Sequence, residues 1–250
     1  MAAQAEWSRD ERKGRRMKFD KFALVTGGNR GIGNAIVRGL CERGVRTLFT
    51  CRNPHDGQLA MMEMAPYARL LDFHPLELSD NQSVEALLNY VRQKYGYLDI
   101  LVNNAAVNYD SWQRVAKVAM AEVEYTMDVN LLGPWRMCNS FIALLKSREN
   151  ARIVNVSSGA GAIENLTGAT PAYSLSKNGL NMLTISLAAD LKDAGIAVNA
   201  ADPGWVRTAM GGENAPKSAE EGADTIVWLA LDASQKLTGG FFRNRTSVSW

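Results

Sequence analysis

Short apolar runs alternate with longer amphipathic stretches along most of this chain, and this alternation limits its fold more than any other feature. Predicted strands lie at residues 22–26, 46–50, within 68–78, and at 98–106, 152–158, 196–204 and 239–242. Predicted helices lie at about 33–43, 80–95, 117–147, 172–194 and 218–231. No hairpin-type turn separates the strands, so right-handed crossovers and a parallel sheet are expected. We predict an α/β fold, a single doubly wound Rossmann-fold domain with a central parallel sheet of about seven strands.

The composition is that of an ordinary globular protein. Of the 250 residues, 46% are hydrophobic and 22% are charged, and the net charge of +2 does not suggest a nucleic-acid partner. No apolar run reaches the roughly 20 residues that a membrane span requires. The three cysteines, Cys41, Cys51 and Cys138, match neither a zinc site nor a disulfide framework. We interpret them as reduced thiols of a cytoplasmic protein that binds neither nucleic acid nor membrane.

The N-terminal residues differ from the rest of the chain. Seven basic residues lie between Arg9 and Lys21, and no apolar stretch here is long enough for a secretory signal. We predict that residues 1–20 form a basic, disordered leader and that residues 21–250 form the Rossmann-fold domain. A tail that binds nucleic acid or an anionic surface is the alternative.

A glycine-rich turn follows the first predicted strand, in the stretch LVTGGNRGIGNAIV (24–37). Gly27, Gly31 and Gly33 have the spacing G-x-x-x-G-x-G. Glycines permit a tight turn and a close approach of the backbone to a pyrophosphate, and the next helix offers its unpaired N–H groups to the anion. In a doubly wound sheet, the end of the first strand is where dinucleotides bind. We therefore expect a dinucleotide cofactor to bind here.

The second predicted strand indicates which dinucleotide binds. NAD sites often carry an acidic residue at the end of this strand, bonded to the ribose 2′-hydroxyl. Here the strand ends in Thr50, Cys51 and Arg52, without an acid, and Arg30 lies in the glycine turn. Two arginines favour a 2′-phosphate, so we predict NADP(H). For Arg52 alone, a solvated loop charge is the alternative interpretation.

A tyrosine and a lysine stand four residues apart in TPAYSLSKNGL (170–180). On a helix Tyr173 and Lys177 would share one face, one turn apart. An isolated pair of this kind is usually an ordinary surface pair. The functional alternative is that the lysine lowers the pKa of the phenol from about 10, so that Tyr173 can exchange a proton near neutral pH.

Taken together, the motifs resemble those of the short-chain dehydrogenase/reductase family. The resemblance covers about residues 20–250, and the stretch DPGWVRTAMGG with APKSAEEGADT is similar to the carbonyl-reductase branch. The motifs that carry it, in order, are TGGNRGIG (26–33), NNAA (103–106), VNLLG (129–133), IVNVSS (153–158), YSLSK (173–177) and DPGWVRT (202–208).

The resemblance implies a catalytic tetrad of Asn130, Ser158, Tyr173 and Lys177, with Ser157 as the alternative serine. In that scheme Ser158 hydrogen-bonds the substrate oxygen and Tyr173 protonates it as hydride reaches the carbon. Lys177 lowers the pKa of Tyr173 and holds the nicotinamide ribose, and Asn130 holds a water that resupplies protons.

The resemblance also implies further cofactor contacts. Glu77 and Leu78 would flank the adenine, and Asn103 and Ala105 would lie along the adenosine. The residues that would face the nicotinamide are Pro203, Gly204, Val206 and Thr208. The complete expected cofactor set is Gly27, Asn29, Arg30, Gly31, Ile32, Gly33, Arg52, Glu77, Leu78, Asn103, Ala105, Tyr173, Lys177, Pro203, Gly204, Val206 and Thr208.

Three departures from the family pattern stand out. Ala106 occupies a usual glycine position, Glu77 occupies a usual aspartate position, and the interval from Ser158 to Tyr173 is about two residues longer than is common. This interval lacks the long helical insertion of monomeric carbonyl reductases. The helices at 117–147 and 172–194 are then free to pair between subunits, and we expect a homodimer or a homotetramer.

Apolar side chains in the loops beyond the strand ends suggest the substrate. No cluster of arginine or lysine lies among them, so a neutral, fairly hydrophobic ketone, aldehyde or quinone fits better than an acid or a phosphate. His55 and His74 are interpreted as surface residues, and no metal site is expected. The candidate pocket residues are Tyr109, Trp112, Ile163, Leu166, Trp205 and Met210.

Three functions follow, from two classes. The first is an NADPH-dependent carbonyl reductase. The second is an NADP-dependent alcohol dehydrogenase that works in the oxidative direction. The third is a non-catalytic NADP-sensing protein, which the intact tetrad disfavours.

Overall fold

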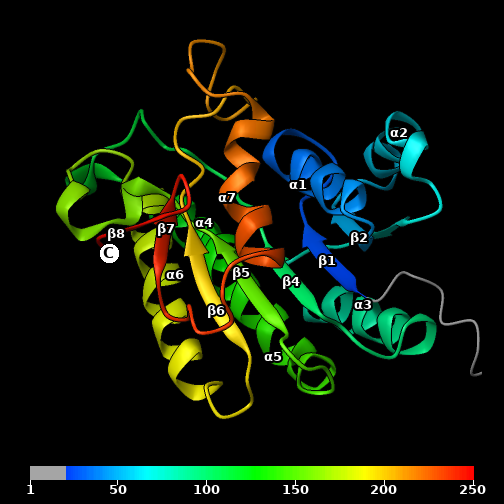
Figure 1. Ribbon diagram of the computed structural model, residues 1–250. Coiled ribbons are helices and arrows are strands. Elements are labelled where there is room, and N and C mark those ends of the chain that lie inside the picture. Colours follow the sequence, from blue (N-terminus) through cyan, green and yellow to red (C-terminus); the bar gives the residue numbers. More distant parts are fainter. Residues whose placement is uncertain (1–20) are drawn as a thin grey trace, which may run out of the picture.

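A computed structural model describes residues 21–250, and the predicted leader at residues 1–20 lies outside the described residues. Within that range the strands form one eight-stranded sheet in the order β3-β2-β1-β4-β5-β6-β7-β8 (Figure 1). β1 to β7 are parallel, and β8 is antiparallel to β7. The strands are β1 Phe22–Thr26, β2 Arg46–Cys51, β3 Leu71–Pro75, β4 Ile100–Asn103, β5 Arg152–Val156, β6 Ala197–Ala201, β7 Phe241–Arg243 and β8 Thr246–Val248.

Helices cover both faces of the sheet. Side chains alternate between the faces of β1, so Phe22 and Leu24 belong to the core cluster with α3, α5 and α6, and Ala23 and Val25 belong to the cluster with α1 and α7. The α-helices are α1 Gly31–Glu42, α2 Pro54–Glu63, α3 Asn81–Lys94, α4 Met120–Met127, α5 Gly133–Lys146, α6 Pro171–Asp190 and α7 Ala219–Leu231. The predicted doubly wound fold is confirmed.

The carboxyl end of β7 corrects the prediction that the chain contains no hairpin. β7 and β8 form an antiparallel hairpin, and Asn244 and Arg245 at its tip have φ of 50° and 59°. Positive φ at both central residues is the geometry of the tight turns that match the twist of a hairpin. The usual signal for such a turn is Asn-Gly, and Asn-Arg hides it. Helix α2, capped by Asn53, was also missed.

The predicted helix at 117–147 is interrupted. α4 and α5 are joined by a π-helical turn at Asp128–Leu132, where the N–H of Gly133 bonds to the carbonyl of Asp128. Pro134 explains the interruption, because it has no N–H for the carbonyl of Asn130 four residues earlier, and its ring would clash with that carbonyl. A residue of the predicted tetrad is therefore located where the helical ladder is broken.

Candidate functional site

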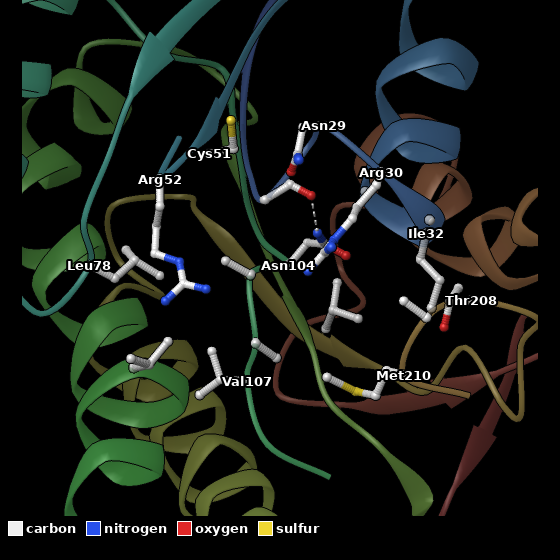
Figure 2. A pocket seen from close by; sticks show the side chains of 18 of the residues that line it. Asn29, Arg30, Ile32, Cys51, Arg52, Leu78, Asn104, Val107, Thr208 and Met210 are labelled. Carbon is white, nitrogen blue, oxygen red and sulfur yellow. Dashed lines mark hydrogen bonds between the residues drawn. The ribbon is translucent and has the colours of Figure 1, made fainter. Parts of the chain in front are cut away.

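A cleft of about 480 Å³ opens at the carboxyl ends of the strands, around the point where β1 separates β2 from β4 (Figure 2). The crevice at such a switch point is the general ligand site of doubly wound sheets. The predicted residues that line it are Gly27, Asn29, Arg30, Gly31, Ile32, Gly33, Arg52, Glu77, Leu78, Ala105, Tyr173, Lys177, Pro203, Thr208 and Met210. Residues outside the predicted cofactor and substrate sets also line it, among them Ser157, the alternative serine: Thr50, Cys51, Leu76, Asn104, Ala106, Val107, Val129, Val156, Ser157, Arg207 and Ala209.

The glycine turn forms the floor of the cleft. Gly27 and Gly31 have φ of 67° and 55°, which disfavour any residue with a Cβ. A Cβ on Gly33 would collide with the carbonyl oxygen of Gly27 and lie 2.5 Å from the amide nitrogen of Asn104. The first turn of α1 has no side-chain cap, because Arg30 at the N-cap makes no such bond. Its free N–H groups therefore face the cleft as an anion site, which fits a pyrophosphate.

The loop after β4 is tied to the glycine turn by Asn104. Its side-chain nitrogen donates to the carbonyls of Thr26 at 2.9 Å and Gly27 at 3.1 Å. Asn103, which we expected along the adenosine, instead points into the core, 2% exposed, and donates to Asn155 Oδ1 at 2.9 Å. The expectation for Asn103 is thus corrected, because the pleat of β4 turns its side chain away from the cleft and leaves Asn104 on the lining.

Two arginines reach the other end of the cleft. Arg52 follows β2 and points into the opening, and Arg30 lies across from it (Figure 2). Arg52 donates to the hydroxyl of Tyr125 on α4 at 2.8 Å, which orients its guanidinium. The cleft lining thus fits the ribose phosphate of NADP, with cations where NAD sites carry an acid. Glu77 lines the same end, but its carboxylate bonds to Ser79.

Tyr173 and Lys177 lie in the first turns of α6 and are 7% and 2% exposed. The lysine nitrogen is 5.6 Å from the centre of the phenol ring and donates to the carbonyl of Val156 at 2.9 Å. Burial lowers the pKa of Lys177 to about 8. Burial raises the pKa of Tyr173 to about 12, although the Ser158 hydroxyl opposes this. The expected lowering of the Tyr173 pKa by Lys177 is therefore not observed in this protein, because burial dominates the pKa of both groups.

The two candidate serines face different neighbours. The hydroxyl of Ser157 is enclosed and donates to Asn181 Oδ1 at 2.5 Å. Ser157 lines the cleft and Ser158 does not, but it is the hydroxyl of Ser158 that acts on Tyr173 and opposes the rise of the tyrosine pKa. Ser158 also caps the short turn that follows it by accepting from Ala160 N at 3.2 Å. The enclosed bond of Ser157 and the link between Ser158 and Tyr173 favour Ser158 as the serine of the site.

Asn130 is fully buried in the π-helical turn. Its amide nitrogen donates to the carbonyl of Val107 at 3.0 Å and to the hydroxyl of Ser176 at 3.1 Å, and its Oδ1 accepts from Val107 N at 2.8 Å. The side chain thus clamps the loop after β4 against α6. A water at this residue would need the backbone carbonyl, from which Pro134 removes the α-helical donor.

Sequence reasoning missed the residue that caps α6. Asp110 is completely buried and accepts from Ala172 N at 3.0 Å and from Tyr173 N at 3.2 Å. Thr170 at the N-cap provides no side-chain bond, so the carboxylate of Asp110 takes this role from a distant loop. Its neighbour Tyr109 packs edge-on against the Tyr173 ring, with ring centres 5.1 Å apart. A local sequence pattern could not predict that Asp110 caps α6, because the two are 62 residues apart.

The remaining predicted contacts lie beyond β6. Pro203, Thr208 and Met210 line the cleft, whereas Gly204 does not. Val206, 3% exposed, packs under Gly222 of α7 and is also absent from the lining. The turn around 203–204 nevertheless holds Pro203 at the cleft beside Tyr173 and Lys177.

The other substrate candidates do not line the cleft and are exposed. Tyr109, Trp112, Ile163, Leu166 and Trp205 are between 41% and 69% exposed. An antiparallel bridge between Arg114 and Ala169 runs the loop of Trp112 beside the loop of Ile163 and Leu166. The result is an apolar rim, a typical feature of sites for hydrophobic ligands.

Residues 21–250 contain no group of three or more histidine, cysteine, aspartate or glutamate side chains placed to hold a metal ion. His55 is exposed, as expected, whereas His74 is half-buried. In the described part of the chain, no helix combines the length and the apolar composition of a membrane span.

The family of the chain is decided by comparison with known proteins. A family model described as short chain dehydrogenase matches residues 21–219. The chain belongs to the short-chain dehydrogenase family. It is an oxidoreductase with the Rossmann-type fold of that family, and the resemblance drawn from its motifs is confirmed.

Several relatives of this short-chain dehydrogenase are carbonyl reductases. Carbonyl reductase (NADPH) 1 of Sus scrofa is 34% identical over 276 aligned positions, which cover 92% of this chain and 94% of that protein. (+)-Neomenthol dehydrogenase of Arabidopsis thaliana is 32% identical and covers 92% of this chain and 97% of its own length. The crystal structure of NADPH-bound carbonyl reductase from chicken fatty liver has a TM-score of 0.85 at 28% identity, covering 92% of this chain and 99% of its own.

Proposed function

We propose that this enzyme reduces a neutral, fairly hydrophobic ketone, aldehyde or quinone with NADPH. The observation that carries the proposal is the pair of Tyr173 and Lys177 in the lining of a dinucleotide cleft, with Ser158 acting on the Tyr173 hydroxyl and the exposed Tyr109 packed against the Tyr173 ring. The similarity to carbonyl reductases in sequence and fold supports the same reaction class.

NADP(H) is the cofactor of this enzyme. Its relatives include proteins named as NADPH carbonyl reductases, and the cations Arg30 and Arg52 stand at the cleft where NAD sites carry an acid. When bound, NADPH supplies the hydride that reaches the substrate carbon. The uncapped N-terminus of α1 receives the pyrophosphate, and Arg30 and Arg52 receive the ribose phosphate.

The side chains of the site handle the substrate oxygen and its proton. The hydroxyl of Ser158 donates a hydrogen bond to the carbonyl oxygen, and the hydroxyl of Tyr173 transfers its proton to that oxygen. A raised pKa keeps Tyr173 protonated at neutral pH, as an acid for the reduction must be. Lys177 holds the ribose at the nicotinamide end, and Asn130 fixes the Val107 loop and leaves its carbonyl to hold a water.

Turnover of a panel of carbonyl compounds tests the proposal. NADPH oxidation is followed with aliphatic and aromatic ketones, aldehydes and quinones, and with keto acids as charged comparisons. The apolar rim predicts higher kcat/KM for the neutral hydrophobic members. Tight NADPH binding without turnover of any compound would instead support the cofactor-sensing function.

The same residues catalyse alcohol oxidation in the reverse direction, because the proton and hydride steps are reversible. The similarity to a protein named (+)-neomenthol dehydrogenase keeps this second function in view. Rates measured in both directions with the best carbonyl compound and its alcohol give the equilibrium position, and the NADPH/NADP⁺ ratio in the cell then sets the direction.

The preference for NADPH over NADH depends on Arg52. We expect Arg52→Asp to lower the ratio of kcat/KM for NADPH over NADH by about tenfold or more. A charge-assisted hydrogen bond to the phosphate is worth about 1.5–3 kcal/mol, and about 1.4 kcal/mol is one factor of ten. Steady-state kinetics with both cofactors measure this, with the exposed Arg69→Asp as the matched control. Equal use of both cofactors by the parent protein would contradict the assignment.

We also propose a homodimer or homotetramer built on α4, α5 and α6. α5, α6 and the π-helical turn before α5 expose large apolar side chains, including Leu132, Trp135, Met182 and Ile185, which are 39% to 64% exposed. An apolar helix face of this extent is typical of an interface. Sedimentation velocity should give a mass above the monomer, and Met182→Asp should lower it; a monomeric parent protein would rule the proposal out.

The division into a basic leader, residues 1–20, and a catalytic domain, residues 21–250, remains a proposal, as does the cytoplasmic location. The buried thiols of Cys41, Cys51 and Cys138 support a reducing compartment. Kinetics of a chain that begins at Met17 test the division, and imaging of a fluorescent fusion tests the location.

A further inference from the structure

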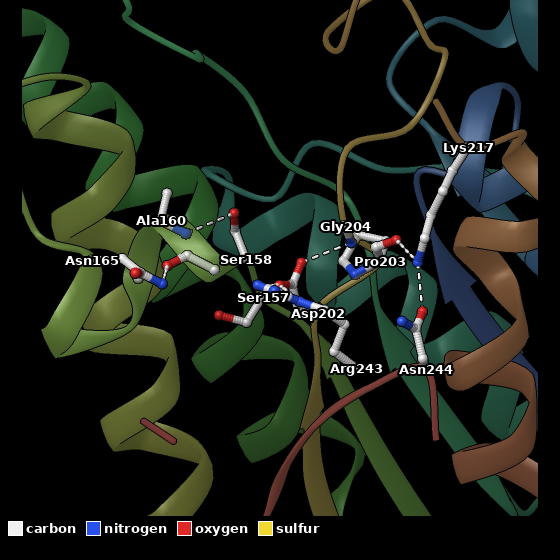
Figure 3. A network of polar contacts seen from close by, with 12 residues as sticks. Ser157, Ser158, Ala160, Asn165, Asp202, Pro203, Gly204, Lys217, Arg243 and Asn244 are labelled. Carbon is white, nitrogen blue, oxygen red and sulfur yellow. Dashed lines mark hydrogen bonds and ion pairs between the residues drawn. The ribbon is translucent and has the colours of Figure 1, made fainter. Parts of the chain in front are cut away.

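A buried carboxylate lies directly before the turn that borders the cofactor cleft. Asp202 is 3% exposed and follows β6. Its Oδ1 accepts from the backbone N–H of Gly204 at 2.8 Å, and its Oδ2 accepts from Nε of Arg243 at 2.6 Å (Figure 3). A second guanidinium nitrogen of Arg243 forms an ion pair with the same oxygen. The charge of Asp202 is therefore held by the adjacent strand, β7.

The same ion pair presses against the turn that carries Ser158. A Cβ on Gly159 would collide with the guanidinium of Arg243 and lie 3.0 Å from the carboxylate of Asp202. A residue larger than glycine could not stand there without displacing the pair. One ion pair thus contacts both the turn after β5 and the turn after β6.

The next residue of the hairpin holds the second turn from another side. Asn244 accepts from Nζ of Lys217 at 2.6 Å, and Lys217 also donates to the carbonyl of Pro203 at 3.2 Å. The stem of Lys217 lies against Gly204, where an added Cβ would be 3.2 Å from the lysine nitrogen. Figure 3 shows these bonds meeting at Pro203 and Gly204. Two residues of the β7–β8 hairpin therefore support the turn at Pro203 and Gly204: Arg243 through Asp202, and Asn244 through Lys217.

We propose that Arg243 is a positioning residue for the reduction: through Asp202 it fixes the Ser158 turn and the Pro203 turn relative to each other and neutralises the carboxylate that acts on Tyr173. The inference rests on the proposed function, because it concerns the residues assigned there. Arg243 itself touches none of the reacting atoms.

The charges of Asp202 and Arg243 should shift the pKa of Tyr173 in opposite directions. The groups that act on the Tyr173 hydroxyl are Ser158 after β5, Asp202 after β6 and Tyr109 after β4. Lys177 on α6 itself lies 5.6 Å from the centre of the Tyr173 ring. Burial is the largest cause of the raised pKa of Tyr173, and the negative charge of Asp202 raises it further. Removal of the Arg243 cation should therefore raise the pKa of Tyr173, and removal of the Asp202 charge should lower it.

Five variants test this in the full-length enzyme: Arg243→Met, Arg243→Lys, Asp202→Asn, the double variant Arg243→Met with Asp202→Asn, and Arg245→Met. Arg245 is a matched control, because it lies on the same hairpin and pairs with Asp224 at the surface, where the side chains are 52% and 45% exposed. For each variant, kcat and KM are measured for NADPH and for the best carbonyl compound, together with the pH profile of the reverse oxidation.

We expect Arg243→Met to lower kcat by about tenfold to a hundredfold, the cost of a small misplacement of reacting groups, with little change in KM for NADPH. The rising limb of the oxidation profile, which reports the phenolate of Tyr173, should move to higher pH by about one unit in Arg243→Met and to lower pH in Asp202→Asn. The double variant removes both charges, so its profile should lie between those of Arg243→Met and Asp202→Asn. Arg243→Lys should recover part of kcat, and Arg245→Met should match the parent enzyme.

Equal behaviour of Arg243→Met and Arg245→Met would overturn the inference, and so would pH shifts of the same sign in Arg243→Met and Asp202→Asn. If Arg243→Met does not fold, Asp202→Asn must still move the oxidation profile to lower pH. If the parent enzyme turns over no carbonyl compound, the proposed function fails on its own. In that case tyrosinate absorbance of each variant, with Tyr173→Phe subtracted, reports the same order of pKa values.

Discussion

Tyr173→Phe should lower kcat/KM for carbonyl reduction by about a hundredfold or more while the Kd for NADPH stays nearly unchanged, since general acid catalysis contributes about 10²–10⁴-fold. The substitution removes only the hydroxyl that donates the proton. The ring stays in place, because its packing against Tyr109 and the backbone bond to Asp110 do not involve that oxygen. Steady-state kinetics and quenching of protein fluorescence by NADPH measure the two quantities.

Tyr67→Phe is the matched control for this result. Tyr67 is half-buried and does not line the cleft, and its hydroxyl donates to Glu42 at 2.7 Å. Its replacement should leave kcat unchanged. Activity of Tyr173→Phe above about a hundredth of the parent value would remove the phenol from its assigned role. Joint loss of NADPH binding and activity would indicate that the substitution disturbs the cleft.

Lys177→Met should abolish most of the activity and yet stabilise the folded protein relative to the parent at neutral pH. Burial lowers the pKa of Lys177 from 10.5 to about 8. A difference of this size between the unfolded and folded chain corresponds to about 3 kcal/mol of unfolding free energy. Below pH 8 the lysine is charged in both states, and the folded protein bears the full cost. Loss of the bond to the Val156 carbonyl offsets about 1 kcal/mol of the gain in the variant.

The pH dependence fixes the sign of this effect. Between pH 8 and 10.5 the unfolded chain binds more protons than the folded protein, so the stability of the parent rises with pH relative to Lys177→Met. Above that window the lysine is neutral in both states and the cost disappears. Urea unfolding at pH 7 and pH 9.5 measures it, with the exposed Lys192→Met as the control. A difference between parent and variant that does not change with pH would contradict the assigned pKa.

Local patterns were sufficient for the sheet and for the central pair of the site. Alternating apolar runs and amphipathic stretches identified seven of the strands, because each buries side chains on both faces of a covered sheet. Tyr173 and Lys177 were found through a spacing within one helix, which a sequence displays directly. The same holds for Gly27, Gly31 and Gly33, whose backbone angles and close contacts exclude other residues.

The features that were missed depend on contacts between residues far apart in the sequence, or on which face of a strand a side chain points to. All four residues of β4 are buried, so the sequence gives no sign that Asn104 rather than Asn103 faces the cleft. Asp110 and Arg243 act on partners 62 and 41 residues away. The break in the helix at 117–147 could have been predicted from the sequence. Pro134 has no N–H to donate to the backbone carbonyl of Asn130, so the α-helical bond between them cannot form.

The hairpin at the sheet edge also bears on the order in which a newly made chain matures. Synthesis delivers Tyr173, Lys177 and Asp202 before β7 and its Arg243. Until residues 241–243 leave the ribosome, Asp202 lacks its cation, and an enclosed carboxylate without a partner is costly. A chain that stops before β7 should therefore hold the end of β6 less firmly and be cleaved faster by proteases than the full chain. Completion of the active site and resistance to proteolysis would then depend on the same ion pair.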